Sequence, residues 1–295
     1  MRVLILGADG MIGHALLRRC SEEVDTWGMT RRPDLHASIH LHHAPHSSLV
    51  IGPEIGSSPA MIRLFDSVRP SVVVNCAGVV KQRGTPDRMQ WSTNGVAPRQ
   101  LAEMVTGRGC RFIHLSTDCV FSGRRGSYHE VDTPDAIDSY GTSKLAGEPA
   151  LDGVLTLRKS AVGLEIRPGM SLVEWLLSRR GARIETLETV MFSAVTTTVL
   201  ADLLVRLITE KPTLSGLFHV ASQPLSKGHF LRHLIAAWKL NITVDENREV
   251  VQDRSLDATS FGQRTGLVVP AWDEMLERLI AEVDRYRYRR DLENL

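Results

Sequence analysis

The stretch of sequence that decides the fold is RVLILGADGMIG, residues 2–13. Its first five residues are apolar after Arg2, which is typical of a buried parallel strand. Three glycines follow at intervals of three, Gly7, Gly10 and Gly13, and the chain then continues into a helical pattern. A strand, a glycine turn and a helix in this order indicate the first unit of a Rossmann-type fold.

The glycine turn predicts a dinucleotide site. We expect Gly7 to allow the tight turn, Gly10 to let a pyrophosphate approach the backbone, and Gly13 to allow close packing of the helix. The amides of Met11 and Ile12 begin that helix, where its positive dipole end favours a phosphate. The alternative is a glycine-rich turn without a ligand, but its place directly after the first strand favours dinucleotide binding.

The end of the second predicted strand, residues 24–29, favours NADP over NAD. A Rossmann fold for NAD usually offers an acidic side chain to the adenosine ribose at this place. Here the chain has Arg31 and Arg32, whose guanidinium groups suit the 2′-phosphate of NADP. Asp34 comes after Pro33, too late for the acidic role. The alternative is that both arginines are solvated surface residues.

Strands and helices alternate through the rest of the first half. Apolar strands are predicted at residues 72–80 and 111–115. Amphipathic helices are predicted at residues 60–68 and 91–106. Alternation without an internal repeat indicates an α/β fold, a Rossmann-type doubly wound parallel sheet covered by helices.

Small and polar residues come at the ends of two of these strands. Asn75, Ala77 and Gly78 fall where a loop at the carboxyl end of a strand meets the cofactor in a doubly wound sheet. Ser116 and Thr117 follow the next strand, where a hydroxyl can donate a hydrogen bond to a substrate carbonyl. Ordinary turn chemistry is the alternative for this pair.

Tyr140 and Lys144 are candidates for acid–base chemistry. Four residues apart, they project from one face if the segment is helical. A phenol has an ordinary pKa of about 10, and a nearby ammonium lowers it. Such a pair can donate the proton that carbonyl reduction needs. The spacing is common by chance, so the alternative is a surface tyrosine with a solvated lysine.

Composition argues against several function classes. The 295 residues are 43% hydrophobic and 23% charged with a net charge of +1, so no nucleic acid or anionic membrane is expected as a partner. No apolar run approaches the roughly 20 residues of a membrane span, and no signal peptide precedes the first strand. The four cysteines lack metal-type spacing. A reduced, cytoplasmic protein is therefore expected.

Two further stretches have unusual composition. Five histidines occur within residues 36–46, but no cysteine or carboxylate accompanies them, so no metal site is expected. Basic and aromatic residues alternate over residues 284–290, which nucleic acid could contact. The solvated end of a terminal helix is the favoured interpretation of this tail.

Together these pieces resemble the extended short-chain dehydrogenase/reductases, and more narrowly their dTDP-4-dehydrorhamnose reductase branch. The motifs that carry the resemblance are GADGMIG at 7–13, NCAG at 75–78, STDCVF at 116–121, GSYHE at 126–130 and YGTSKLAGE at 140–148. The resemblance covers residues 1–160 and is thinner afterwards.

The resemblance implies roles for individual residues. Thr117 would orient and polarise the substrate carbonyl, Tyr140 would donate the proton, and Lys144 would hold the nicotinamide ribose and lower the pKa of Tyr140. Thr117 and Tyr140 would thereby also contact the substrate, and Asn94 would support Lys144. The hydride would come from the reduced nicotinamide, because no side chain can supply one.

Asp118 and Lys81 are expected to complete the substrate site. The sequence departs from the family pattern at residues 81–82 and at residues 157–160, where LRKS replaces the more usual Arg-Thr-Ser. These departures suggest a sugar other than that of the namesake enzyme. The chain also has Ile and Gly at residues 51–52, where the family often has an aspartate that touches the adenine.

The two domains are expected to interleave in sequence. Residues 1–160 predict the NADP-binding Rossmann domain, with a segment near residues 190–225 returning to it. Residues 161–295 predict mainly a smaller substrate-binding domain. Dimers are common in this fold, so a homodimer is a further expectation.

The leading expectation is an NADPH-dependent reductase of a nucleotide-activated 4-keto-6-deoxysugar, in deoxysugar or polysaccharide biosynthesis. A dehydratase of this family carries Thr-Asp-Glu, and Cys119 stands in place of that glutamate. An epimerase with a retained NAD(P) would use the same Tyr140 and Lys144. A non-catalytic NADP-binding regulatory subunit is the rival from another class, against which the retention of Thr117, Tyr140 and Lys144 argues.

Overall fold

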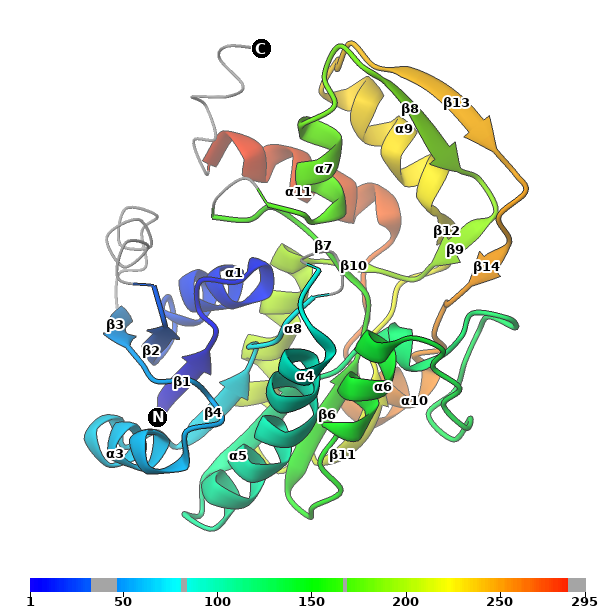
Figure 1. Ribbon diagram of the computed structural model, residues 1–295. Coiled ribbons are helices and arrows are strands. Elements are labelled where there is room, and N and C mark those ends of the chain that lie inside the picture. Colours follow the sequence, from blue (N-terminus) through cyan, green and yellow to red (C-terminus); the bar gives the residue numbers. More distant parts are fainter. Residues whose placement is uncertain (33–46, 81–83, 167–168, 286–295) are drawn as a thin grey trace.

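A parallel sheet of seven strands forms the centre of the protein (Figure 1). The computed structural model describes residues 1–32, 47–80, 84–166 and 169–285. The strand order is β11-β6-β5-β4-β1-β2-β3. The strands are β1 (Arg2–Leu6), β2 (Asp25–Thr30), β3 (Ser47–Ile51), β4 (Val72–Asn75), β5 (Arg111–Leu115), β6 (Val154–Arg158) and β11 (Gly216–His219). The order reverses between β1 and β4, which is where such a sheet binds ligands.

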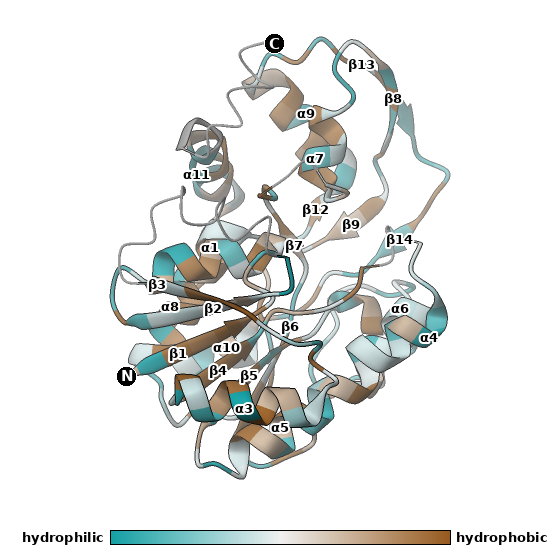
Figure 2. Ribbon diagram, turned by 60° about the vertical axis from the view of Figure 1, so that its left-hand side comes forward, coloured by the Kyte–Doolittle hydropathy of each residue, from teal (hydrophilic) through white to brown (hydrophobic). Residues whose placement is uncertain are grey.

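Helices cover both faces of the sheet. The helices α1 (Met11–Cys20) and α8 (Thr197–Thr209) pack on one face, and α3 (Ser58–Val68) and α5 (Ala97–Thr106) on the other. Alternate residues of β1 enter the two cores, since Val3 belongs to the first and Leu4 to the second. Both faces of a strand are therefore buried, which explains the continuous apolar runs, brown in Figure 2. The predicted doubly wound parallel sheet is confirmed.

The predicted helix over residues 91–106 has two parts in the structure and is preceded by a short helix. The helix α4 (Asp87–Gln90) leads into a π-helical turn, Trp91–Val96, and this turn continues as α5. Pro98 has no N–H to donate to the carbonyl of Asn94, so the regular ladder cannot run through this point. Single π-turns often mark functional sites, and this one carries Asn94.

A second, smaller part of the chain lies beyond the carboxyl ends of the strands, at the top of Figure 1. Its core includes a cluster of aromatic rings in which Phe192, Phe230 and Trp272 are 5.7–5.8 Å apart. Its helices are α7 (Leu172–Leu177), α9 (Lys227–Ala237) and α11 (Trp272–Arg285). Its strands are β7 (Ala161–Val162), β8 (Arg183–Leu187), β9 (Val190–Phe192), β10 (Val195–Thr196), β12 (Leu225–Ser226), β13 (Thr243–Asn247) and β14 (Gln252–Asp253).

The chain crosses between the two parts more than once. After β6 it enters the smaller part through β7, and Lys159 and Ser160 separate these two strands. It then returns through α8 and β11, and β11 pairs with β6 at the edge of the main sheet. The helix α10 (Thr259–Thr265) also packs on this side.

Candidate active site

The glycine turn after β1 has the geometry that the sequence predicts. Gly7 has a φ of +75°, and a Cβ there would lie 2.8 Å from the Cα of Ala77. A Cβ on Gly13 would lie 2.0 Å from the carbonyl oxygen of Gly7. Any larger residue would therefore push the turn away from α1 or from the loop after β4.

The start of α1 is left open for a ligand. Gly10 caps the helix without a side-chain hydrogen bond and is exposed. The following amides, of Met11 and Ile12, begin the helix at its positive dipole end. Bare amides at a helix start beside a glycine turn fit a pyrophosphate, so these residues suit a dinucleotide.

The two predicted arginines lie beside this turn. Arg31 and Arg32 follow β2 directly and are exposed. The Nε atom of Arg32 is 3.9 Å from Oδ2 of Asp9, a residue of the glycine turn. Exposed guanidinium groups next to the glycine turn would suit the extra phosphate of NADP if a dinucleotide binds there.

The loop after β4 is shaped from within by Asn75. This side chain is fully buried, its Nδ2 lies 3.2 Å from Nδ1 of His114, and its Oδ1 accepts from the amide of Ala77 at 3.2 Å. Asn75 therefore fixes the loop, while Ala77 and Gly78 form the part that lies near the glycine turn. That Asn75, Ala77 and Gly78 face a cofactor stays a prediction.

The segment with the predicted proton donor is helical. The helix α6 (Ser139–Ala146) begins at Asp138, whose Oδ1 accepts from the amide of Gly141 at 2.8 Å. A Cβ on Gly141 would lie 2.2 Å from the carbonyl oxygen of Cys119. This close approach brings Tyr140 beside Thr117, and the two side chains interact.

Thr117 and Asp118 follow the end of β5. The hydroxyl of Thr117 accepts from the amide of Cys119 and donates to Oδ1 of Asp118, both at 3.1 Å. It thereby caps a short 3₁₀ turn, Asp118–Val120. The structure thus brings together Thr117, Asp118 and Tyr140, which the sequence predicts to act on the substrate.

Burial dominates the acid–base properties of Tyr140 and Lys144. It raises the pKa of Tyr140, and the interaction with Thr117 opposes this shift. The ammonium of Lys144 donates to the carbonyl of Leu115 at 2.7 Å, and burial, with the charge of Lys159, lowers the pKa of Lys144 to about 7. The expected lowering of the Tyr140 pKa by Lys144 is therefore not found in the protein chain by itself.

Asn94 supports the site differently from the expectation. Its Oδ1 accepts from the amide of Val79 at 2.9 Å, and its Nδ2 donates to the carbonyl of Val79 at 3.0 Å and to Ser143 at 3.4 Å. It therefore ties the loop after β4 to α6 one residue before Lys144. A Cβ on Gly147 would lie 1.8 Å from the carbonyl oxygen of Asn94, which explains the second glycine of the YGTSKLAGE motif.

Two cations at this site were not predicted from the sequence. Lys159 directly follows β6, and its carbonyl accepts from the amide of Asp118 at 3.2 Å. Arg254 reaches in from the smaller part, and its Nη1 donates to Sγ of Cys119 at 3.6 Å. The Nε of Arg254 is buried without a hydrogen-bond partner in the described residues. Of these two residues, only Lys159 stood out in the sequence, because it replaces the threonine of the more usual Arg-Thr-Ser.

A buried ion pair lies beside this site, at the carboxyl end of β6. Arg158, the last residue of β6, binds both carboxylate oxygens of Glu148, at 2.9 and 2.8 Å. Glu148 also accepts from the hydroxyl of Ser116. The pair thereby joins the end of α6 to the ends of β5 and β6.

Some predicted features lie outside the described residues. They are Lys81, the histidines of residues 36–46 and residues 286–290 of the tail. Across the described ranges, no cluster of His, Cys, Asp or Glu could hold a metal ion. No helix in these ranges is long and apolar enough to span a membrane.

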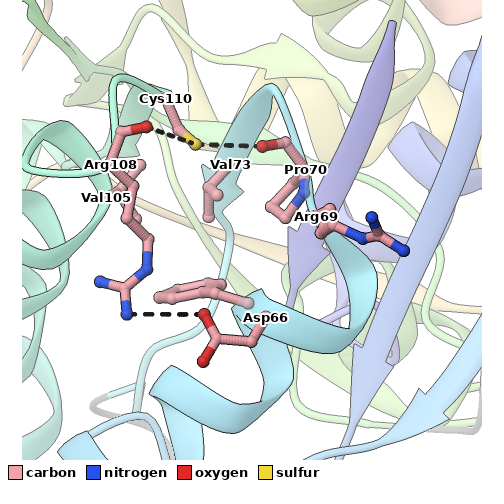
Figure 3. A pocket seen from close by; sticks show the side chains of 8 residues that line it. Asp66, Arg69, Pro70, Val73, Val105, Arg108 and Cys110 are labelled. Carbon is pink, nitrogen blue, oxygen red and sulfur yellow. Dashed lines mark hydrogen bonds and ion pairs between the residues drawn. The ribbon is translucent and has the colours of Figure 1, made fainter.

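A cavity of about 380 Å³ lies at the opposite end of the strands, beside the amino ends of β4 and β5 (Figure 3). Its floor is apolar, and its rim carries the pair Arg108–Asp66, 3.8 Å apart. The lining residues come from the ends of α3 and α5 and the starts of β4 and β5, and they are Phe65, Asp66, Arg69, Pro70, Val73, Val105, Arg108 and Cys110. No predicted site residue is among them.

Known proteins resemble the chain over most of its length. The "Probable low-salt glycan biosynthesis reductase Agl14" of Haloferax volcanii is 30% identical, with 97% of this chain and 99% of that protein covered. The "Probable dTDP-4,6-dihydroxy-2-methyloxan-3-one 4-ketoreductase" of Streptomyces antibioticus is 31% identical, with 75% and 72% covered.

A solved structure shows the same fold. The dTDP-4-dehydrorhamnose reductase of Bacillus anthracis in complex with NADP matches with a TM-score of 0.77 and 22% identity, covering 95% of this chain and 99% of that one. The family model described as "RmlD substrate binding domain" matches residues 1–285. The chain therefore belongs to the RmlD substrate binding domain family, within the extended short-chain dehydrogenase/reductases.

Proposed function

We propose that the protein is an NADPH-dependent reductase of a nucleotide-linked 4-keto-6-deoxysugar. One observation carries this proposal: the side chains of Thr117 and Tyr140 meet at the carboxyl edge of the sheet. The open glycine turn of residues 7–13 lies at the same edge. A proton donor and a dinucleotide site at one edge suit hydride transfer to a carbonyl.

Each residue has a role that its surroundings support. When bound, the dihydronicotinamide supplies the hydride. Tyr140 donates the proton to the carbonyl oxygen, because a phenol, with an ordinary pKa of about 10, carries its proton at neutral pH. Thr117 orients the carbonyl, and Lys144, one helical turn from Tyr140, holds the nicotinamide ribose.

The cofactor is NADPH rather than NADH in this proposal. The support is the exposed pair Arg31 and Arg32 beside Asp9 of the glycine turn. A guanidinium group recognises the 2′-phosphate through charge-assisted hydrogen bonds, which NADH cannot form. The cytoplasmic location and the homodimer remain predictions.

The substrate class follows from the relatives and from the smaller part of the chain. Relatives that align over most of this chain are named as reductases of glycan synthesis or of dTDP-linked keto sugars. Arg254 of the smaller part offers a half-buried guanidinium beside Cys119, where an anionic nucleotide sugar would gain a partner. A role in deoxysugar or polysaccharide biosynthesis follows.

The test is an assay with a panel of substrates. The purified protein is mixed with NADPH and, one at a time, dTDP-, UDP- and GDP-linked 4-keto-6-deoxysugars, and the loss of NADPH absorbance is followed. NADH runs in parallel. We expect oxidation that requires one sugar and prefers NADPH. Tight cofactor binding without oxidation by any of these sugars would favour an epimerase or a regulatory subunit instead.

A further inference from the structure

Lys159 places a second lysine at the catalytic edge of the sheet. It follows β6, and its carbonyl accepts from the amide of Asp118, so it stands next to the Thr117–Asp118 segment. Its charge acts on Lys144 of α6 and on Cys76 of the loop after β4. The ammonium therefore lies within reach of all three loops at the ends of β4, β5 and β6.

The ammonium of Lys159 has no direct partner. Within the described ranges, no hydrogen bond or ion pair joins it to another side chain. The carboxylate that acts on it most is Asp118, which already accepts from Thr117 and Cys119. The carboxylate that acts on Lys144 is Glu148, which is already bound by Arg158, so neither lysine ammonium has a carboxylate of its own.

We propose that Lys159 biases the site towards reduction by disfavouring the oxidised cofactor. The inference rests on the proposed function, in which the nicotinamide lies beside Tyr140 and Lys144. The oxidised nicotinamide ring carries a positive charge, and the reduced ring is neutral. A fixed cation beside the ring therefore weakens the binding of NADP⁺ and leaves that of NADPH nearly unchanged.

The expected size follows from Coulomb's law. Two unit charges about 7 Å apart at an effective dielectric constant of about 20 repel enough to change a dissociation constant more than tenfold. Screening by salt and solvent reduces this figure. We therefore expect Lys159 to contribute about tenfold to the ratio of the NADP⁺ and NADPH dissociation constants.

The experiment measures cofactor binding without any sugar. The full chain and its Lys159→Thr variant, which restores the more usual family residue, are titrated with NADPH by fluorescence and with NADP⁺ by calorimetry, at low salt and pH 6.5. In the unsubstituted protein, we expect NADPH to bind more tightly than NADP⁺. In Lys159→Thr, this preference should fall about tenfold, mainly through tighter binding of NADP⁺.

Two further variants separate charge from shape. Lys159→Arg keeps the charge and should keep the preference, while Lys159→Met removes the charge from a side chain of similar length and should behave as Lys159→Thr. An equal preference in all variants would overturn the proposal. So would equal weakening of both cofactor forms in Lys159→Thr, which would mean that Lys159 binds a phosphate common to both.

The outcome also separates this inference from the proposed function. If the unsubstituted protein binds neither NADPH nor NADP⁺, the proposed function fails and the inference fails with it. If it binds both, with a preference that does not depend on residue 159, only the inference fails.

Discussion

The carboxyl ends and the amino ends of the strands, here called the carboxyl edge and the amino edge of the sheet, differ in how firmly their charged side chains are fixed. At the carboxyl edge, Glu148 and Arg158 are only 12% and 4% exposed and bind each other through two hydrogen bonds. At the amino edge, Asp66 and Arg108 are 66% and 33% exposed and stand 3.8 Å apart at the rim of a cavity (Figure 3). The same fold therefore contains a tightly fixed charged network and a loose one.

This difference supports the carboxyl edge as the candidate active site. A cavity of about 380 Å³ lies at the amino edge, but none of its lining residues is a predicted site residue. The carboxyl edge instead has close backbone approaches, buried cations and a shifted lysine pKa. Perturbed ionisable groups are a better guide to a catalytic site than volume.

The largest contrast is expected when one partner of each ion pair is neutralised. Glu148→Gln leaves Arg158 buried without a counter-charge, and we expect it to lower the free energy of unfolding by about 3–5 kcal/mol. Asp66→Asn breaks the exposed pair and should cost less than about 1 kcal/mol. Urea denaturation of both variants checks this. Similar losses for the two would mean that the edges do not differ in this way.

A smaller effect is expected in the pH dependence of stability. The folded pKa of Lys144 is about 7, below the ordinary lysine pKa of about 10.4, so the unfolded chain binds more protons between these two values. Stability should therefore rise with pH through this window, by about 1 kcal/mol per pH unit from this group. Below pH 7 the full cost of burying the charge remains.

Lys144→Met is the variant that isolates this contribution. It should be more stable than the unsubstituted protein at pH 7, with a difference that shrinks towards pH 9.5. Lys211→Met, in the loop before β11, is the control and should leave the pH profile unchanged. A constant offset between the profiles of Lys144→Met and the unsubstituted protein would contradict the assigned pKa.

The smallest effect concerns cofactor choice. We expect Arg31→Ala combined with Arg32→Ala to weaken NADPH binding about tenfold, because a charge-assisted contact is lost. NADH binding should change little. Arg69→Ala at the amino edge is the matched control and should alter neither. Binding titrations with both cofactors check this, and equal losses for NADPH and NADH would exclude recognition of the 2′-phosphate.

Local sequence predicted the parts of the site that one segment builds by itself. The glycine turn was predicted in detail, because the positive φ of Gly7 and the contact between Gly13 and Gly7 arise within one βα unit. The spacing of Tyr140 and Lys144 predicted a shared face only on the condition that the segment is helical, and α6 meets that condition. Parallel strands with both faces buried can also be recognised in the sequence, because they are continuous apolar runs.

Contacts between distant segments were beyond that reasoning. Arg254 meets Cys119 across 135 positions, and the partner of Asn94 is a backbone loop 15 positions earlier. Neither leaves a local pattern. The pKa of Tyr140 shifted upward because burial outweighs the lysine charge, and burial is a property of the whole fold.

The central claim is that Tyr140 donates the proton at a nicotinamide site, and Tyr140→Phe tests it most directly. The variant removes one hydroxyl and keeps the ring. With the sugar identified by the panel, we expect kcat to fall by about 10²–10⁴-fold while the dissociation constant for NADPH changes less than about twofold. Retained kcat in Tyr140→Phe would contradict the account.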